Sequence, residues 1–430
     1  MPPDQKGVFF IDTHCHMFTI ADIPLYHSIR QILEDNDRTW TYLAFPLIPF
    51  IRPFYDPHKA LNHFAPFIKY FELEPEQAVE KLAREVSQAL SGAAFQPYAD
   101  NLRQVVLTPL MMDFDETGQV VKLTGQVNRL LEAIKNQQEK IAGNLKVLPF
   151  LGLCPERPNI PDLMEAFRLK SVQERGGYES CANGDMIGIK LYPPLGFKVN
   201  PEYDKHKRHK YLTFYRELAQ RGLPVTTHCQ KSSFSFTDRK EREAFTAPMN
   251  WEDVFQELTE EERNNFRINF AHFGGDDEVY ATIVYERVVT TDAKLYEEAF
   301  HHVSNKTWTY SIIRLLKRYR HTYSDLGAFN FDFSEALASL YWLLYLDETG
   351  AFKELGDFKL IDKLLWGSDY PMTLNKRQRG YEEILDKFVA ACQFTPHTDG
   401  RVEYPPLDKL PAPAEVIKKL VCDNPQKFLF

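Results

Sequence analysis

The sequence predicts an α/β fold in which eight parallel strands alternate with helices and close into a (β/α)8 TIM barrel, with long helical or irregular insertions after strands 1 and 6. Short apolar runs rich in β-branched residues recur along the chain, and several are followed by helical patterns, as in successive βα units. The candidate strands are Val8–Thr13, Gln104–Leu110, Lys146–Leu153, Ile187–Tyr192, Pro224–His228, Arg267–Ala271, His321–Gly327 and Lys363–Gly367. Because eight βα units need only about 250 residues, much of this 430-residue chain must lie in insertions.

Three segments have the character of such insertions. Residues 21–98 separate the first two strands and include an amphipathic helix expected at Pro75–Leu90. Residues 276–306 are acidic and helical, and residues 395–413 are rich in proline and precede a last helix. None of these segments has a strand set of its own in the sequence pattern. We therefore expect residues 1–430 to form a single decorated domain.

The composition is that of an ordinary globular protein, with 44% apolar and 26% charged residues. A net charge of −9 argues against a nucleic-acid partner, because phosphate binding needs a clustered basic surface. The one dense basic run, Asp204–Lys210, is interpreted as a solvated face. No secretory signal is visible, and no apolar stretch approaches the ~20 residues of a membrane span. Six cysteines without paired spacing predict free thiols, so we expect a cytoplasmic protein.

The segment IDTHCH ends the first candidate strand. Side chains alternate between the two faces of a strand, so His14 and His16 project to one side and Cys15 to the other. Two imidazoles on one face form a preorganised clamp for a metal ion. Taken alone, the pair is equally compatible with two structural histidines.

Polar residues also end three later candidate strands. His228 ends LPVTTH, His272 ends INFAH, and Asp369 follows KLLWGS. In a barrel the C-terminal ends of all strands meet at one rim, so these distant residues become neighbours. The residue types suit zinc, iron or manganese, which accept nitrogen and oxygen ligands. The sequence therefore predicts a metal centre held by His14, His16, His228 and Asp369.

Seven segments extend this pattern along the chain: IDTHCH, GIKLYP, THC, AHFGG, YSDLGAF, WGSDYP and DNPQKFLF. In this order they resemble the amidohydrolase superfamily, and in particular its "amidohydrolase 2" branch. That branch includes aminocarboxymuconate-semialdehyde decarboxylase, resorcylate-type decarboxylases and hydrolases. The likeness runs from Val8 to Phe430, with the insertions outside it.

The resemblance implies roles for individual residues. Asp369 would be a metal ligand that also takes the proton from the attacking water, and His272 would hydrogen-bond that water or an oxyanion. Lys190, in GIKLYPP, matches a lysine that is carboxylated in members with two metals. We favour one divalent metal per chain, zinc before manganese or iron, and a plain Lys190 whose ammonium faces substrate oxygens. The sequence is also compatible with a structural His272 and with an interior Lys190 paired with a carboxylate.

Two further residues are candidates for substrate contact. Arg157 and Tyr192 lie near the ends of the third and fourth candidate strands. An arginine there could hold a carboxylate through two parallel hydrogen bonds, although a surface arginine explains the sequence equally well. The aromatic, proline-rich tract Thr41–Pro57 follows the first strand, and we expect it to cap the site or to form an oligomer contact, with the cap favoured.

The function that these observations predict is a metal-dependent hydrolase, which uses metal-activated water on a small, carboxylated organic substrate. A second hypothesis is a non-oxidative decarboxylase of an aromatic or muconate-like acid. Many decarboxylases of the branch have Glu at the first position of HxH, and this chain keeps His14, which favours hydrolysis. Two more distant hypotheses are a barrel-type metal deoxyribonuclease, which the acidic net charge disfavours, and a metal-binding barrel without catalysis. A homo-oligomer is compatible with each of these functions.

Overall fold

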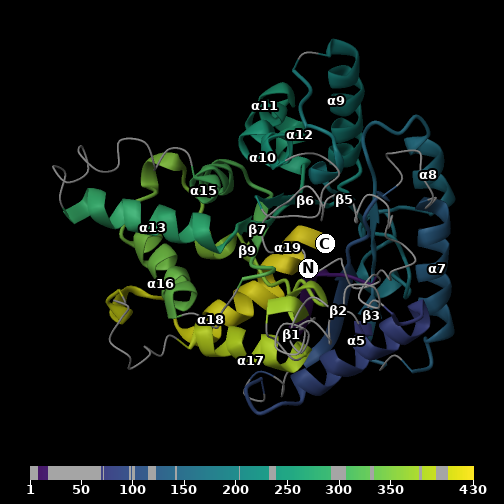
Figure 1. Cartoon of the computed structure of the whole chain (residues 1–430), viewed down its shortest axis with the longest axis horizontal. Coiled ribbons are helices and arrows are strands. Elements are labelled where there is room, and N and C mark those ends of the chain that lie inside the picture. Colours follow the sequence, from purple (N-terminus) through teal and green to yellow (C-terminus); the bar gives the residue numbers. More distant parts are fainter. Residues whose placement is uncertain are drawn as a thin grey trace, which may run out of the picture.

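The computed structural model shows parallel strands surrounded by helices (Figure 1). It describes residues 8–17, 69–70, 72–95, 98, 102–114, 123–140, 143–202, 204–231, 239–291, 307–329, 334–376, 380–393 and 405–430. The strands pair in parallel in two hydrogen-bonded sheets, of order β1-β2-β3 and β4-β5-β6-β7-β8-β9. Their bounds are β1 Val8–Cys15, β2 Leu102–Pro109, β3 Leu145–Val147, β4 Phe150–Gly152, β5 Gly188–Leu191, β6 Val225–Gln230, β7 Ile268–Gly274, β8 Thr322–Asp325 and β9 Leu364–Leu365.

The two sheets join at both ends and form a ring. An isolated bridge between Leu110 and Phe150 links the end of β2 to β4, so β3 and β4 occupy one strand position. A second bridge links Cys15 of β1 to Tyr370 after β9. Thr13 N also donates to Trp366 O at 3.1 Å. The eight predicted strand positions are therefore confirmed, and the fold is an α/β barrel.

The observed strand ends lie within three residues of the predicted ones, and two of the differences have a clear physical cause. The run predicted as one strand, Lys146–Leu153, divides at Leu148–Pro149 into β3 and β4. Proline has no N–H to donate, so a regular ladder stops there. The predicted strand Lys363–Gly367 contracts to β9, because the residues after Leu365 turn toward β1 and bond with it.

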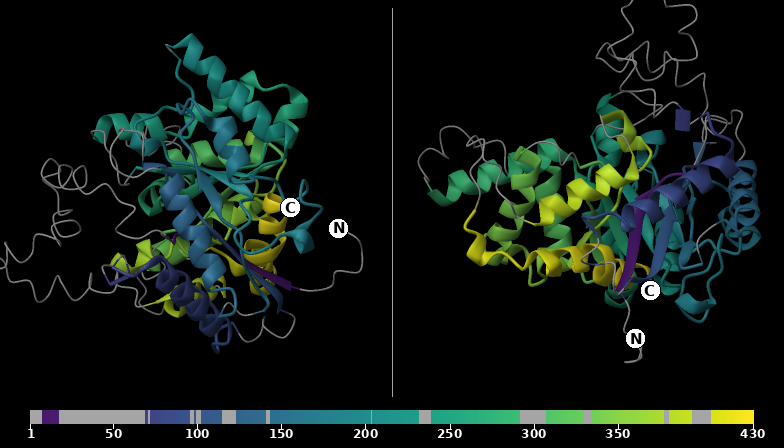
Figure 2. Two further views of the ribbon diagram at one scale, coloured as in Figure 1. Left: turned by 90° about the vertical axis from the view of Figure 1, so that its right-hand side faces the viewer. Right: turned by 90° about the horizontal axis from the view of Figure 1, so that it is seen from below.

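Helices cover the outside of the ring (Figures 1 and 2). Helix α5 has the bounds predicted for it, begins with Pro75 at a capping box formed by Glu74 and Gln77, and packs against α7 and α17. The helices are α5 Pro75–Leu90, α7 Leu123–Asn136, α8 Ile160–Ala166, α9 Lys205–Gln220, α10 Arg239–Thr246, α11 Met249–Glu257, α12 Glu260–Asn265, α13 Asp276–Thr291, α15 Trp308–Arg318, α16 Ser334–Glu348, α17 Tyr381–Cys392, α18 Pro413–Lys418 and α19 Asn424–Leu429.

The C-terminal helices close the end of the barrel at which the strands begin. The Phe428 ring packs on Phe150 of β4 and Tyr323 of β8, with centroids 6.2 and 5.6 Å away. Phe430 packs on Phe9 of β1, and Figure 2 shows the C-terminus beside the start of this strand. The opposite rim, where the strands end, is the one that carries the predicted metal ligands.

Several sequence predictions concern the insertions and the surface. The tract Thr41–Pro57 lies outside the described residues, as do residues 292–306 and 394–404 of the other two insertions. The basic run forms the start of α9, where Asp204 accepts hydrogen bonds from His206 N and Lys207 N, both at 3.0 Å. All six cysteines are buried and none forms a disulfide bond, as predicted. Among the described helices, none has both the length and the apolar character needed to cross a membrane.

Candidate metal centre

His14, His16 and Asp369 meet at the C-terminal rim of the barrel. Nε2 of His16 lies 3.2 Å from Oδ1 of Asp369, and Nε2 of His14 lies 3.4 Å from the same oxygen. One ligand atom from each residue lies within 4.8 Å of the others, and all three side chains are buried. Tetrahedral ligands about 2.1 Å from one ion are about 3.4 Å apart. The spacing therefore fits a single transition-metal ion.

Both histidines present Nε2 to this centre because Nδ1 is already engaged. Nδ1 of His14 lies 3.0 Å from Oδ2 of Asp325, and Nδ1 of His16 lies 2.9 Å from the carbonyl oxygen of Leu110. Since Nδ1–H donates to each oxygen, Nε2 carries a lone pair, which is the form that binds metal. Nε2 of His14 is buried and makes no hydrogen bond among the described residues. Such an orphaned acceptor fits a metal ligand.

Asp369 is an ionised carboxylate held in an unusual backbone conformation. Burial raises its pKa, but the facing histidines, His16 first, outweigh burial and hold the pKa well below its usual range. Its φ of 51° lies in the left-handed region, and its N–H donates to His14 O at 2.7 Å. Gly367 allows this approach, because a Cβ there would lie 2.6 Å from His14 Cβ. Such strain is typical of functional sites.

His272 and His228 form a second pair of imidazoles beside the first. The His272 ring lies 4.6 Å from the His14 ring, and its Nδ1 bonds Gly327 O at 3.0 Å. Its Nε2 lies 3.1 Å from Nδ1 of His228. Burial lowers the pKa of His272 to about 4 and holds that of His228 well below 6.5. Both rings are therefore neutral at pH 7.

The predicted fourth ligand, His228, is close to this centre but not in the same cluster. It contacts His272 and Tyr192, with ring centroids 4.7 Å away in each case. The described residues cluster in two overlapping groups with metal-ligand spacing: His14 with His16 and Asp369, and His14 with His272 and Asp325. Nε2 of His228 is buried and makes no hydrogen bond in the described chain. The atom is available for a ligand.

Comparison with known proteins assigns the chain to a family. The sequence model of the amidohydrolase family matches residues 179–430, more than half of the chain. The chain belongs to the amidohydrolase family. It is therefore an enzyme of a metal-dependent family, as the motifs predicted. The matched region holds Lys190, His228, His272 and Asp369, and it begins after β1.

Three of the solved structures that match this chain do so over nearly its whole length at low sequence identity. A probable 2-pyrone-4,6-dicarboxylic acid hydrolase from Acinetobacter baumannii is 16% identical, covers 98% of each chain and has a TM-score of 0.44. A 5-carboxyvanillate decarboxylase from Novosphingobium aromaticivorans, solved with manganese, is 13% identical over 99% of this chain and 97% of that one, with a TM-score of 0.47. A 2,6-dihydroxybenzoate decarboxylase from Rhizobium is 10% identical over 99% and 98%, with a TM-score of 0.42. Comparison with curated protein sequences gives no match.

Lys190 of this amidohydrolase lies inside the barrel beside the cluster. Its side chain is 1% exposed, and Nζ makes no hydrogen bond within the described part of the chain. Burial lowers the pKa of Lys190 to about 8, against the opposing effect of Asp325 and Asp369. Nζ also lies 5.8 Å from the centre of the Tyr192 ring. A direct ion pair between Lys190 and a carboxylate, which the sequence also allowed, is absent among the described residues.

Arg157, a candidate for substrate contact, is bound to a carboxylate of this chain. Its guanidinium binds the carboxylate of Asp113 through Nε and Nη2. Asp113 also accepts a hydrogen bond from Cys154 N at 3.0 Å, which ties the segment after β4 to the segment after β2. The carboxylate that Arg157 binds in this structure is therefore that of Asp113, and contact between Arg157 and a substrate stays a prediction. Tyr192, the second candidate for substrate contact, does lie against His228.

The sequence analysis assigned no role to Asp325, which organises the amidohydrolase centre. Its carboxylate accepts hydrogen bonds from His14 Nδ1, from Asn269 Nδ2 at 2.7 Å, from His272 N at 3.1 Å and from Gly327 N at 2.9 Å. Burial raises the pKa of Asp325, but His14 and these donors outweigh burial and hold the pKa far below its usual range. The sequence feature that could have identified Asp325 is its position as an acidic residue at the end of the β8 run TYSD.

A second buried carboxylate, Asp12, joins the two strands that carry the cluster. It accepts hydrogen bonds from Ser368 Oγ at 2.6 Å, Tyr381 Oη at 2.8 Å and the backbone N–H groups of Ser368 and His14, each at 3.1 Å. Asp12 thus fixes His14 relative to the turn that carries Asp369. Sequence reasoning missed this residue as well, although an acidic side chain within the apolar run VFFID was visible.

Proposed function

We propose that this amidohydrolase is a metal-dependent hydrolase of a small, carboxylated organic substrate, with one metal ion held by His14, His16 and Asp369 and completed by His228. The observation that carries the proposal is the convergence of two Nε2 atoms and one carboxylate oxygen in a buried site, with both Nδ1 atoms already bonded. Zinc is the first candidate and manganese or iron the second, since imidazole and carboxylate ligands suit all three ions.

A divalent ion in this site would act as a Lewis acid, which acidifies water and polarises a substrate carbonyl. The residues of the chain supply the rest. Asp369 is ionised at neutral pH, so it can accept the proton of the attacking water. His272 holds its Nδ1 on Gly327 O, which directs Nε2 toward the other rings. In that orientation the lone pair of Nε2 faces Nδ1 of His228 at 3.1 Å, and we propose that it hydrogen-bonds the water instead when His228 binds the metal.

Lys190 supports the assignment of a carboxylated or otherwise oxygen-rich substrate. Its amine is buried without a hydrogen bond among the described residues, next to two carboxylates that help to keep it largely protonated at pH 7. A substrate oxygen would satisfy this group, whereas an unpaired buried ammonium is costly. We propose a plain, uncarboxylated Lys190, since one metal ion leaves no second cation to stabilise a carbamate. The free thiols support a reducing, cytoplasmic location, and we propose one domain over residues 1–430.

A substrate panel tests the reaction type. Metal-loaded protein would be incubated with carboxylated lactones, esters and amides and with aromatic carboxylic acids, and products would be followed by chromatography with parallel measurement of carbon dioxide. The proposal expects ring opening or cleavage without carbon dioxide, and loss of turnover in Asp369→Asn. Carbon dioxide release as the sole reaction would show that the enzyme is a decarboxylase instead.

A further inference from the structure

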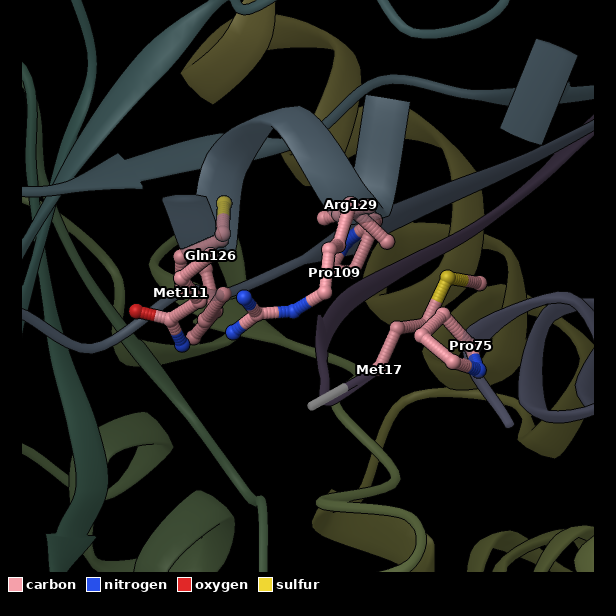
Figure 3. Close-up of a pocket in the computed structure, with 8 residues that line it drawn as sticks. Met17, Pro75, Pro109, Met111, Gln126 and Arg129 are labelled. Carbon is pink, nitrogen blue, oxygen red and sulfur yellow. The ribbon is translucent and has the colours of Figure 1, made fainter. Parts of the chain in front are cut away.

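Buried polar atoms without hydrogen bonds among the described residues lie at both ends of the barrel. Near the strand ends, the amide of Gln126 lines a small pocket beside Met17 and Pro109 (Figure 3). This pocket has room for about one water molecule, so a water suffices for the amide. At the opposite end, where the strands begin, the unsatisfied atoms are Nη1 of Arg267 and Nδ1 of His321. They belong to a group of basic side chains that the proposed mechanism does not use.

Three neighbouring strands begin directly after a basic residue. Arg267 precedes β7, His321 precedes β8 and Lys363 precedes β9. Backbone hydrogen bonds hold these strand starts side by side. Ile268 N donates to His321 O at 2.9 Å, and Ser324 N donates to Lys363 O at 3.0 Å. The three basic residues are therefore gathered at one edge of the ring.

The alternation of side chains along a strand places Arg267 and His321 on the inner face of the ring. Asn269, two residues after Arg267, bonds Asp325, four residues after His321, inside the barrel. Side chains an even number of residues apart share one face of a strand. The ring of Tyr323, between His321 and Asp325, packs on α19. The two basic side chains thus border the mouth that α19 closes, at the end of the barrel opposite the metal centre.

The positive charge at this mouth has no matching carboxylate among the described residues. Neither Arg267 nor the neighbouring Arg320 forms an ion pair in the part of the chain that the structure describes. Lys363 donates to two backbone carbonyl oxygens, which are neutral. Asp362, the acidic neighbour of Lys363, is already bonded to Lys419. A half-buried guanidinium without a counter-charge is costly, and an anion would remove that cost.

The donors at this mouth suit a phosphate group. Burial and the facing cations Arg267, Arg320 and Lys363 lower the pKa of His321 to about 4, so its ring is neutral at pH 7 and has one N–H to donate. Arg267 and His321 each offer one buried nitrogen, and they do so from two different strands. Donors from separate directions fit the three oxygens of a phosphate group, whereas a carboxylate is bound best by two parallel N–H groups of one guanidinium.

We propose that this mouth binds a phosphate group, free or carried by a small molecule, through Arg267 and His321, with Arg320 as a further cation. We call it the strand-start site. It is separate from the metal centre, so a ligand there would act on the protein without competing with a substrate at the metal.

The binding test must distinguish the strand-start site from the metal, because a metal ion also binds phosphate. Inorganic phosphate, phenyl phosphate and acetate would be titrated by calorimetry into metal-loaded wild type and into His14→Ala/His16→Ala. Both proteins should bind phosphate at the strand-start site, and acetate should bind more weakly. Binding of inorganic phosphate alone would identify the free ion as the ligand, and binding of phenyl phosphate as well would admit a phosphate ester.

Substitutions in the His14→Ala/His16→Ala background assign the binding to named residues. Arg267→Met and His321→Gln should each weaken phosphate binding about tenfold to hundredfold. The matched control is Arg103→Met, because Arg103 also lies at the start of a strand, β2, but pairs with Glu179 at 3.6 Å. The control for the histidine is His209→Gln, at an exposed position of α9. Both controls should keep the phosphate affinity of their background.

Thermal unfolding separates a binding role from a structural one. In phosphate-free buffer Arg267→Met should unfold at the same temperature as wild type or higher, because it removes a cation without a counter-charge. Phosphate should then raise the unfolding temperature of wild type and not that of the variant. A fall of several degrees in phosphate-free Arg267→Met would overturn the proposal. No phosphate binding in His14→Ala/His16→Ala, undiminished binding in both Arg267→Met and His321→Gln, or equal binding of acetate would also overturn it.

Discussion

Asp325 offers the sharpest test of how the protein prepares its metal ligands. Its two oxygens accept four hydrogen bonds, from His14 Nδ1 and Asn269 Nδ2 on Oδ2 and from the N–H groups of His272 and Gly327 on Oδ1. In Asp325→Asn one of the two oxygens becomes an NH2 group, which is itself a donor. Whichever way the amide is turned, two of the four donors then face this NH2 group and lose their acceptor. If Nδ1 of His14 loses its acceptor, the proton can move to Nε2, and the lone pair no longer faces the metal.

The expected size of this effect follows from the groups involved. Removal of a partner that orients a metal-binding histidine costs about 10–100-fold in metal affinity. Two buried donors without acceptors cost about 1–3 kcal/mol each, so the free energy of unfolding should fall by about 2–6 kcal/mol. Metal affinity would be measured by competition with a chromophoric chelator, and folding by circular dichroism and thermal unfolding.

The matched control for Asp325→Asn is Asp113→Asn. Asp113 is also a buried carboxylate with several donors, but its partners are Arg157 and the N–H of Cys154. The Asp113→Asn protein should be less stable than wild type and should keep wild-type metal affinity. Because the Asn amide can still turn its oxygen toward His14, Asp325→Ala would be measured beside it, and wild-type metal affinity in a folded Asp325→Ala protein would refute the idea that this carboxylate sets the tautomer of His14.

Three more substitutions give separate tests. Asp369→Asn keeps an oxygen but cannot take a proton, so turnover should fall at least ~10²–10⁴-fold; near-wild-type turnover would exclude it as the base. Lys190→Ala should impair turnover and leave the metal content unchanged, whereas an intact-mass increment of one carbon dioxide in wild type would indicate a carbamate. Burial lowers the pKa of His321 to about 4 in the folded protein. As the pH falls, His321 therefore becomes protonated in the unfolded chain before it does so in the folded protein. The contribution of His321 to the free energy of unfolding should therefore be intact above pH 6.5 and fall by about 1–2 kcal/mol toward pH 4, after discounting for solvent screening. This loss should be smaller in His321→Gln, and a variant with the same pH profile as wild type would refute the assignment to His321.

The features that the sequence predicted are those with a local signature. Short apolar runs rich in β-branched residues located the strands, and the proline and the apolar spacing of α5 located its ends. Polar residues at strand ends pointed to His14, His16 and Asp369. The one broken strand contains Pro149, which was visible, but the extent of each ladder depends on neighbouring strands far along the chain. Strand β9 is short because the segment after it bonds to β1.

The features that the sequence did not predict depend on contacts between distant residues. Asp325 bonds His14 across 311 positions, and Arg157 meets Asp113 across 44. No spacing rule connects such pairs, so Asp325 was given no role and Arg157 was assigned to substrate. Gln126 occupies an ordinary position of an amphipathic helix, and only its burial without a partner among the described residues distinguishes it. The position of His228 against His272, beside the cluster of His14, His16 and Asp369, likewise follows from ring packing.

Metal content of the purified protein tests the central claim most directly. Wild type, loaded with zinc or manganese and freed of excess ion, would be analysed for metals beside His14→Ala/His16→Ala and the control His206→Ala/His209→Ala, whose histidines are exposed on α9. We expect about one transition-metal ion per chain in wild type and control, and none in the first double variant, which should remain folded. Wild type without bound metal, or a double variant that retains the full amount, would contradict the metal centre described here.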